Sequence, residues 1–165
     1  MTMPAERIKA LLAPHLSQAA VRGLMVELAK VPSQQTELFE AEPLLRQFIE
    51  TAVAPRLRQM GFADLRFDAM GNLIATYGAN RSGASLMLCS NAMNQPQATM
   101  KNAYSGEVID GRPHGLPGEA VMGKGLSEQK ATMAAMLHAI DAVIRSGTPI
   151  DGRLVFLCCI SRDSI

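Results

Sequence analysis

The sequence has 165 residues, of which 48% are hydrophobic and 19% are charged, and its formal net charge is +1. This length and balance predict one globular domain spanning residues 1–165. The near-neutral charge, the absence of a Lys/Arg-rich block and the 4% aromatic content without Trp argue against nucleic acid and against membrane surfaces as partners.

The cysteines and the N-terminus indicate a compartment. Cys89, Cys158 and Cys159 form no C-x-x-C pair, and two of them are adjacent in an apolar run. They are typical of buried thiols in a reducing compartment rather than of a structural zinc site. The N-terminus lacks the apolar segment of a signal peptide, and no stretch reaches the ~18 apolar residues that span a bilayer. We therefore expect a cytoplasmic protein.

The first third of the chain has helical periodicity. Apolar residues at three- and four-residue spacings predict one or two amphipathic helices over residues 5–30, with Pro14 as an interruption. A second helix is predicted from about Glu37 to Met60, with Pro43 and Pro55 near helix starts or kinks.

Short strands follow. Residues 65–68 alternate like a strand, residues 73–77 form a second one, and the apolar run 86–89 is typical of a strand buried on both faces. Residues 90–122 lack periodicity and contain several Gly and Pro, which predicts a long loop or a short hairpin. Loops of this length inside a domain are usually functional.

The stretch from Gly118 to Lys130 combines a Gly-rich turn with the start of a helix. Ser127 can cap this helix, and Glu128 in its first turn complements the helix dipole. The apolar run 131–144 continues the helix, and Gly147 stands at the expected C-terminal position. Free backbone N–H groups at such a turn often take part in a site.

The final apolar run, residues 154–160, predicts another two-sided strand. Strand, loop, helix and parallel strand form a βαβ crossover. The predicted fold class is therefore α/β, with a mixed, largely parallel sheet flanked by helices.

From about residue 20 onward the chain resembles the zinc-dependent amidohydrolases and exopeptidases of the acetylornithine deacetylase, succinyl-diaminopimelate desuccinylase, aminoacylase and carboxypeptidase G family. The resemblance lies in three motif positions in the family's order. The stretch Cys89-Ser90-Asn91-Ala92-Met93 stands where the family has Gly-His-x-Asp, and residues 123–131 stand where it has Gly-Arg-Gly-x-x-Asp-x-Lys-Gly. Ser161-Arg162-Asp163 stands where it has Asp-Glu-Glu.

Residue by residue, the resemblance implies a changed site. The family's histidine ligand falls on Asn91, the aspartate that orients it on Met93, and the bridging aspartate on Glu128. The general-base glutamate falls on Arg162 and the neighbouring ligand on Asp163. An amide is a weak replacement for imidazole at zinc, and an Arg cannot accept a proton from a bound water. Glu128 and Asp163 remain as carboxylate contacts for zinc or another divalent metal, too few for a two-zinc centre.

The resemblance also implies a partial catalytic domain, because family members continue beyond this last strand and carry an inserted dimerisation domain. We expect an exposed sheet edge to favour a C-terminal partner chain or self-association.

Three functions compete. The first is hydrolysis of amide or peptide bonds in small acylated amino acids or peptides, in which this chain alone is inactive. The second is a metal-independent amidase, since Ser127 and Lys130 have the Ser-x-x-Lys spacing that places a hydroxyl and an amine one helical turn apart. The third is a non-catalytic protein that binds a ligand or partner in the same cleft, with the loop amides of Asn91, Asn94, Gln95, Gln97 and Gln129 as hydrogen-bonding groups and His114 as a stand-in ligand.

Overall fold

The computed structural model describes residues 3–35, 42–95 and 99–160. The helices of the N-terminal part are α1 (Ala5–Leu12), α2 (Gln18–Ala29), α3 (Pro43–Phe48) and α4 (Ala54–Gln59). A 3-10 turn, Ala13–His15, follows α1, and a π-helical turn, Ile49–Val53, joins α3 to α4. The strands are β1 (Asp64–Phe67), β2 (Leu73–Tyr77), β3 (Ser85–Asn91), β4 (Glu107–Asp110), β5 (Glu119–Met122) and β6 (Arg153–Cys159), with α5 (Ala131–Arg145) before β6.

The prolines act as the sequence predicts. The helix of residues 5–30 is divided near Pro14, which lies at the start of the 3-10 turn that follows α1. Pro43 and Pro55 lie in the first turns of α3 and α4. Pro43 fits there because the first N–H groups of a helix have no intrahelical acceptor. Pro55 instead follows the π-helical turn within a continuous helical stretch, which is a common site for a proline. The part of the predicted second helix before Glu42 lies outside the described residues.

The main sheet has the strand order β1-β2-β6-β3. β3 and β6 are parallel and are joined by a crossover through α5, so the predicted βαβ unit is confirmed. The mixed α/β class is confirmed as well. The expectation that the sheet is largely parallel is wrong, because the β1–β2 and β2–β6 pairings are both antiparallel. The short turn at Gly71 (φ 89°) returns the chain directly, which only an antiparallel neighbour permits.

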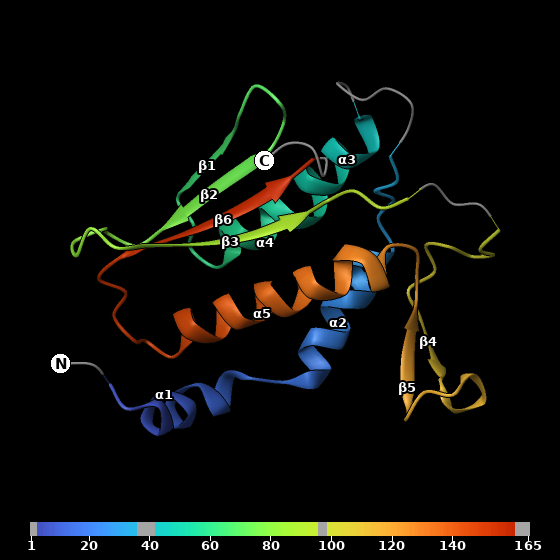
Figure 1. The fold of residues 1–165 in the computed structure, drawn as a ribbon, viewed down its shortest axis with the longest axis horizontal. Coiled ribbons are helices and arrows are strands. Elements are labelled where there is room, and N and C mark those ends of the chain that lie inside the picture. Colours follow the sequence, from blue (N-terminus) through green and yellow to red (C-terminus); the bar gives the residue numbers. More distant parts are fainter. Residues whose placement is uncertain (1–2, 36–41, 96–98, 161–165) are drawn as a thin grey trace.

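Residues 90–122 contain a short hairpin, β4–β5. Of the two predicted alternatives, a long loop or a short hairpin, the hairpin is confirmed. The hairpin projects away from the main sheet, whereas α5 runs alongside it (Figure 1). The hydrophobic core lies between the sheet and the helices and includes side chains from α2, α4, α5, β2 and β6, among them Leu28, Leu57, Leu137, Leu73 and Phe156. None of the helices in the described part of the chain has the length and apolar character needed to span a bilayer.

Candidate functional site

The Gly-rich turn packs tightly against two other segments. Gly125 has a φ of 86°, and a Cβ at this position would lie 2.9 Å from Oδ1 of Asn94. A Cβ on Gly123 would lie 2.7 Å from Cβ of Ala29 at the end of α2. Real Cβ atoms do not approach other heavy atoms this closely, so both contacts require glycine. The helix begins at Leu126 with a π-helical turn, Leu126–Lys130, which continues into α5.

Ser127 is therefore not the cap of this helix. Gly125 occupies the N-cap position in the left-handed conformation, and no side chain caps the helix start. Ser127 lies one residue inside the first turn and is exposed.

Asn94 connects the segment after β3 with the segment after α2. Its side chain is completely buried: Oδ1 accepts a hydrogen bond from Oγ of Ser33 at 2.7 Å, and Nδ2 donates to the carbonyl of Gln95 at 3.0 Å. Its backbone N–H donates to Ser33 O, and its carbonyl accepts from the N–H of Gln35, each at 3.0 Å. Because a buried amide without partners is costly, this bonding fixes both segments in one arrangement.

Glu128 lies against the same segment. Its Oε2 accepts the backbone N–H of Gln95 at 3.0 Å, and its Oε1 accepts from Nζ of Lys124 at 2.8 Å. The Lys124 and Glu128 side chains are only 19% and 23% exposed, so water screens this ion pair less than it screens a surface pair. The carboxylate that the resemblance places at a bridging position is thus close to the end of β3, and both of its oxygens already accept hydrogen bonds.

Lys130 is buried beneath this contact. Its ammonium donates to the carbonyl of Val31 at 2.6 Å and lies 5.0 Å from the ring centroid of Phe48 and 5.5 Å from that of Tyr104. Burial lowers the pKa of Lys130 to about 8, although the charge of Glu128 acts in the opposite direction. The hydroxyl of Tyr104 donates to Oε1 of Gln34 at 2.8 Å, and burial raises the pKa of Tyr104.

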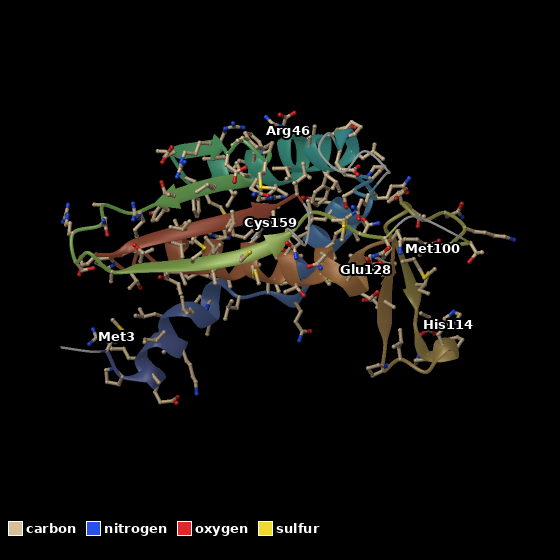
Figure 2. All side chains as sticks on the ribbon, turned by 45° about the horizontal axis from the view of Figure 1, so that its top comes forward. Met3, Arg46, Met100, His114, Glu128 and Cys159 are labelled. Carbon is tan, nitrogen blue, oxygen red and sulfur yellow. The ribbon has the colours of Figure 1, made fainter. Side chains whose placement is uncertain are left out.

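We call this set of contacts the junction, defined as Ser33, Asn94, Gly125, Glu128 and Lys130. It joins the ends of α2 and β3 to the start of α5. Figure 2 shows Glu128 close to the C-terminal end of β3, where parallel α/β sheets commonly bind ligands.

Two of the predicted site residues, Asn91 and Met93, lie at the end of β3 or just after it. Asn91 is the last residue of β3, opposite Cys159 of β6, and its Oδ1 is buried without a hydrogen-bond partner. Met93 is 4% exposed and packs with Leu45 and Ile160 in a small apolar cluster. A thioether in such a cluster fills space and cannot orient an imidazole through a charge-assisted hydrogen bond.

The structure does not bring Ser127 and Lys130 together. Ser127 lines a groove of about 780 Å³ between α2, β5 and the start of α5, whose lining also includes Arg22 and Glu119. The amine of Lys130 is instead bonded to Val31 in the interior. His114 is exposed on a 3-10 turn of the hairpin, and Figure 2 shows it far from Glu128. Arg162, Asp163 and Gln97 lie outside the described residues.

The donor groups of the described residues do not fit a two-zinc centre. No cluster of three or more His, Cys, Asp or Glu side chains occurs in residues 3–35, 42–95 and 99–160. Glu128 is paired with Lys124, and Asn91 offers one amide oxygen. Zinc sites use imidazole, thiolate and carboxylate ligands, usually four in number.

Sequence reasoning missed Ser33, Tyr104 and Lys124 as members or neighbours of this site. The spacing of four residues between Lys124 and Glu128 was visible in the sequence, but Lys124 precedes the N-cap Gly125, so the i,i+4 rule for helices does not predict this pair. Ser33 and Tyr104 contact residues 61 and 70 positions away, respectively, and no local pattern announces such contacts.

No protein-family model and no curated protein sequence matches the chain. Solved structures do match. Human carnosine dipeptidase 1 superposes with a TM-score of 0.71 at 15% identity over 99% of this chain and 36% of that chain. The di-peptidase Dug1p from Saccharomyces cerevisiae superposes with a TM-score of 0.67 at 11% identity, over 93% of this chain and 34% of that chain.

A tripeptidase from Staphylococcus aureus gives 0.60 at 16% identity over 87% of this chain and 36% of that chain. The chain therefore has the fold of part of these peptidases, and it spans about a third of their length.

Proposed function

We propose that the protein is a divergent hydrolase of peptide or amide bonds in small peptides or acylated amino acids, and that residues 1–165 alone are inactive. The observation that carries the proposal is the place of Glu128. Its carboxylate accepts the backbone N–H of Gln95, two residues beyond the motif stretch that ends at Met93, so the first two motif stretches of the amidohydrolase and exopeptidase resemblance lie next to each other in space. The fold likeness to two dipeptidases and a tripeptidase supports the same reaction class.

Two observations support the proposed inactivity of residues 1–165 alone, namely the donor groups of the described residues and the share of the matched peptidases that the chain covers. The described residues provide one paired carboxylate and one unpaired amide oxygen at the strand end. The matched peptidases are about three times longer, and polypeptide beyond these residues would have to supply the remaining groups. If zinc or another divalent metal takes part, its ligands must come largely from that additional polypeptide.

The test compares residues 1–165 with the product of the whole reading frame that contains them. Both are assayed for release of free amino acids from a panel of dipeptides and N-acyl amino acids. We expect no turnover by residues 1–165 and measurable turnover by the whole product. Glu128→Gln should reduce that turnover at least a hundredfold, whereas Glu107→Gln on the exposed face of the hairpin should leave it unchanged. Full activity of Glu128→Gln would contradict the proposal.

A second candidate is a non-catalytic protein that binds peptides through the same strand ends. The Lys124–Glu128 ion pair favours it, because it occupies the carboxylate that the resemblance assigns to the metal. This candidate predicts that the whole product binds dipeptides measurably by calorimetry and hydrolyses none of the panel. Hydrolysis that Glu128→Gln abolishes would exclude it.

A further inference from the structure

Two cysteines face each other across neighbouring strands. Sγ of Cys89 on β3 lies 3.7 Å from Sγ of Cys159 on β6. In the parallel register, Cys89 is opposite Leu157 and Cys159 is opposite Asn91, so the two are diagonal neighbours on the same face of the sheet. Cys158 points to the other face, where it belongs to the main core. Of the two adjacent cysteines, Cys159 is therefore the one that can reach Cys89.

The two thiols differ in access to solvent. Cys89 is partly exposed on β3, which pairs only with β6 among the described strands. Cys159 is completely buried, and its pKa is raised to about 12, chiefly by burial. A dissolved reagent therefore meets Cys89 first, and Cys159 can react only with a group already attached to Cys89.

We propose that Cys89 and Cys159 form a reversible intrachain disulfide on exposure to a low-molecular-weight disulfide such as glutathione disulfide. The thiolate of Cys89 attacks one sulfur of the reagent, the reagent's S–S bond breaks, and one reagent thiol leaves with a proton from solvent. Cys159 then loses its proton to water and attacks Sγ of Cys89, which releases the second reagent thiol. Two protein thiols are oxidised to one disulfide, and one reagent disulfide is reduced to two thiols.

The side chains already point toward each other, but the bond requires a movement of the backbone. The sulfurs must approach from 3.7 Å to about 2.05 Å. Diagonal neighbours two residues apart on adjacent strands have Cα atoms about 8 Å apart, beyond the usual disulfide range of about 4.4–6.8 Å, so β3 must shift toward Cys159 by about 1 Å or more. This shift is expected in β3 rather than in β6. The β3 residues Leu86 and Met87 are 61% and 57% exposed, so few packing contacts oppose it.

The bond would link β3 to its neighbour two residues before Asn91, and so next to the segment that leads into the junction. Oxidation is therefore expected to fix the end of the strand that leads to Gln95, whose backbone N–H donates to Glu128.

The test incubates the reduced protein with glutathione disulfide at pH 8, followed by unfolding and alkylation of the remaining thiols. The reduced protein has three free cysteines. We expect the treated protein to retain a single alkylatable thiol and to lose about 2 Da before alkylation, as oxidation of one dithiol requires. After trypsin, peptides 82–101 and 154–162 should be joined.

Variants identify the partner. Cys158→Ala should still form the linked peptides, whereas Cys159→Ala should stop at the mixed disulfide between Cys89 and glutathione. In the wild type, fragmentation of the linked peptide between residues 158 and 159 gives the same assignment independently of how the variants fold.

The conversion of mixed to intrachain disulfide should become about tenfold faster per pH unit between pH 7 and 9, because the thiolate fraction of Cys159 increases. Three alkylatable thiols after equilibration, or a link from Cys89 to Cys158, would overturn the proposal.

Discussion

β3 begins and ends in opposite surroundings. At its start, Leu86 and Met87 are 61% and 57% exposed, and Leu86 borders an apolar cavity of about 420 Å³ between the strand and α5. Just beyond its end, Ala92, Met93 and Asn94 are at most 4% exposed, and Asn94 is held in the junction by Ser33. We call the first region the edge, defined as residues 85–89.

The contrast separates two roles along a single strand. The junction satisfies its polar groups almost entirely with its own chain, because Asn94, Glu128 and Lys130 all have hydrogen-bond partners there. The edge leaves apolar side chains and one side of a strand without a described neighbour. A strand of this kind can pair with another chain. The junction therefore maintains a geometry, and the edge is available for association.

The largest expected effect comes from breaking the junction at Gly125. Gly125→Ala places a Cβ 2.9 Å from the Asn94 side chain and forces a non-glycine residue to adopt a φ of 86°. We expect the free energy of unfolding to fall by about 2–4 kcal/mol in urea titrations.

Gly147→Ala is the matched control for this substitution. Its φ of 68° is also left-handed, but no atom lies within 4 Å of the added Cβ. It should lower the free energy of unfolding by only about 1 kcal/mol, the cost of the backbone conformation alone. Equal effects of the two substitutions would show that the contact between the turn and Asn94 is unimportant.

A pH titration tests the buried amine of the junction. The pKa of Lys130 is about 8 in the folded protein and 10.5 in its unperturbed state. Between these values the unfolded chain holds more protons, so the free energy of unfolding should rise by about 2 kcal/mol from pH 8 to pH 10 because of this residue. Lys130→Met should remove that rise, and Lys101→Met, at an exposed position, should preserve it. The same rise in Lys130→Met as in wild type would contradict a buried, proton-releasing amine.

Much of the fold was predictable from local pattern. Residues 73–77 form β2 with the predicted bounds, and the apolar spacing of residues 131–144 corresponds to α5. The bounds of β3 were predicted less well, because Ser90 and Asn91 are polar yet continue the ladder with β6. The sheet was predicted with too many parallel pairs, since an apolar run indicates burial on both faces and says nothing about strand direction.

The site was predictable only in part. The resemblance assigns a metal-bridging position to Glu128, and that role stays a prediction; the ion pair of Glu128 with Lys124 is visible only in three dimensions. The prediction that Ser127 caps the helix was wrong. Gly125, in the left-handed conformation, is the N-cap, so the helix begins two residues earlier than it would with Ser127 as the cap. The role of Asn94 depends on Ser33, which is 61 residues away in the chain.

The smallest effect on folding should come from the edge. Leu86→Lys changes an exposed side chain, so its free energy of unfolding should remain within about 0.5 kcal/mol of wild type. If the edge pairs with a second copy, wild type will associate with increasing concentration in sedimentation velocity experiments, and Leu86→Lys will remain monomeric. Met70→Lys, a similarly exposed site at 59% on the β1–β2 turn, should associate like wild type. A wild type that is monomeric at all concentrations would show that the edge does not bind a second copy.

Zinc binding to residues 1–165 tests most directly whether Glu128, in these residues alone, is held in the junction by Lys124 and Gln95 rather than bound to metal. The protein is loaded with zinc, passed over a desalting column and analysed for metal. With Glu128 held by Lys124 and Gln95, we expect less than about one equivalent per chain and the same amount for Glu128→Gln. Two tightly retained equivalents in the wild type, lost in Glu128→Gln, would contradict the account.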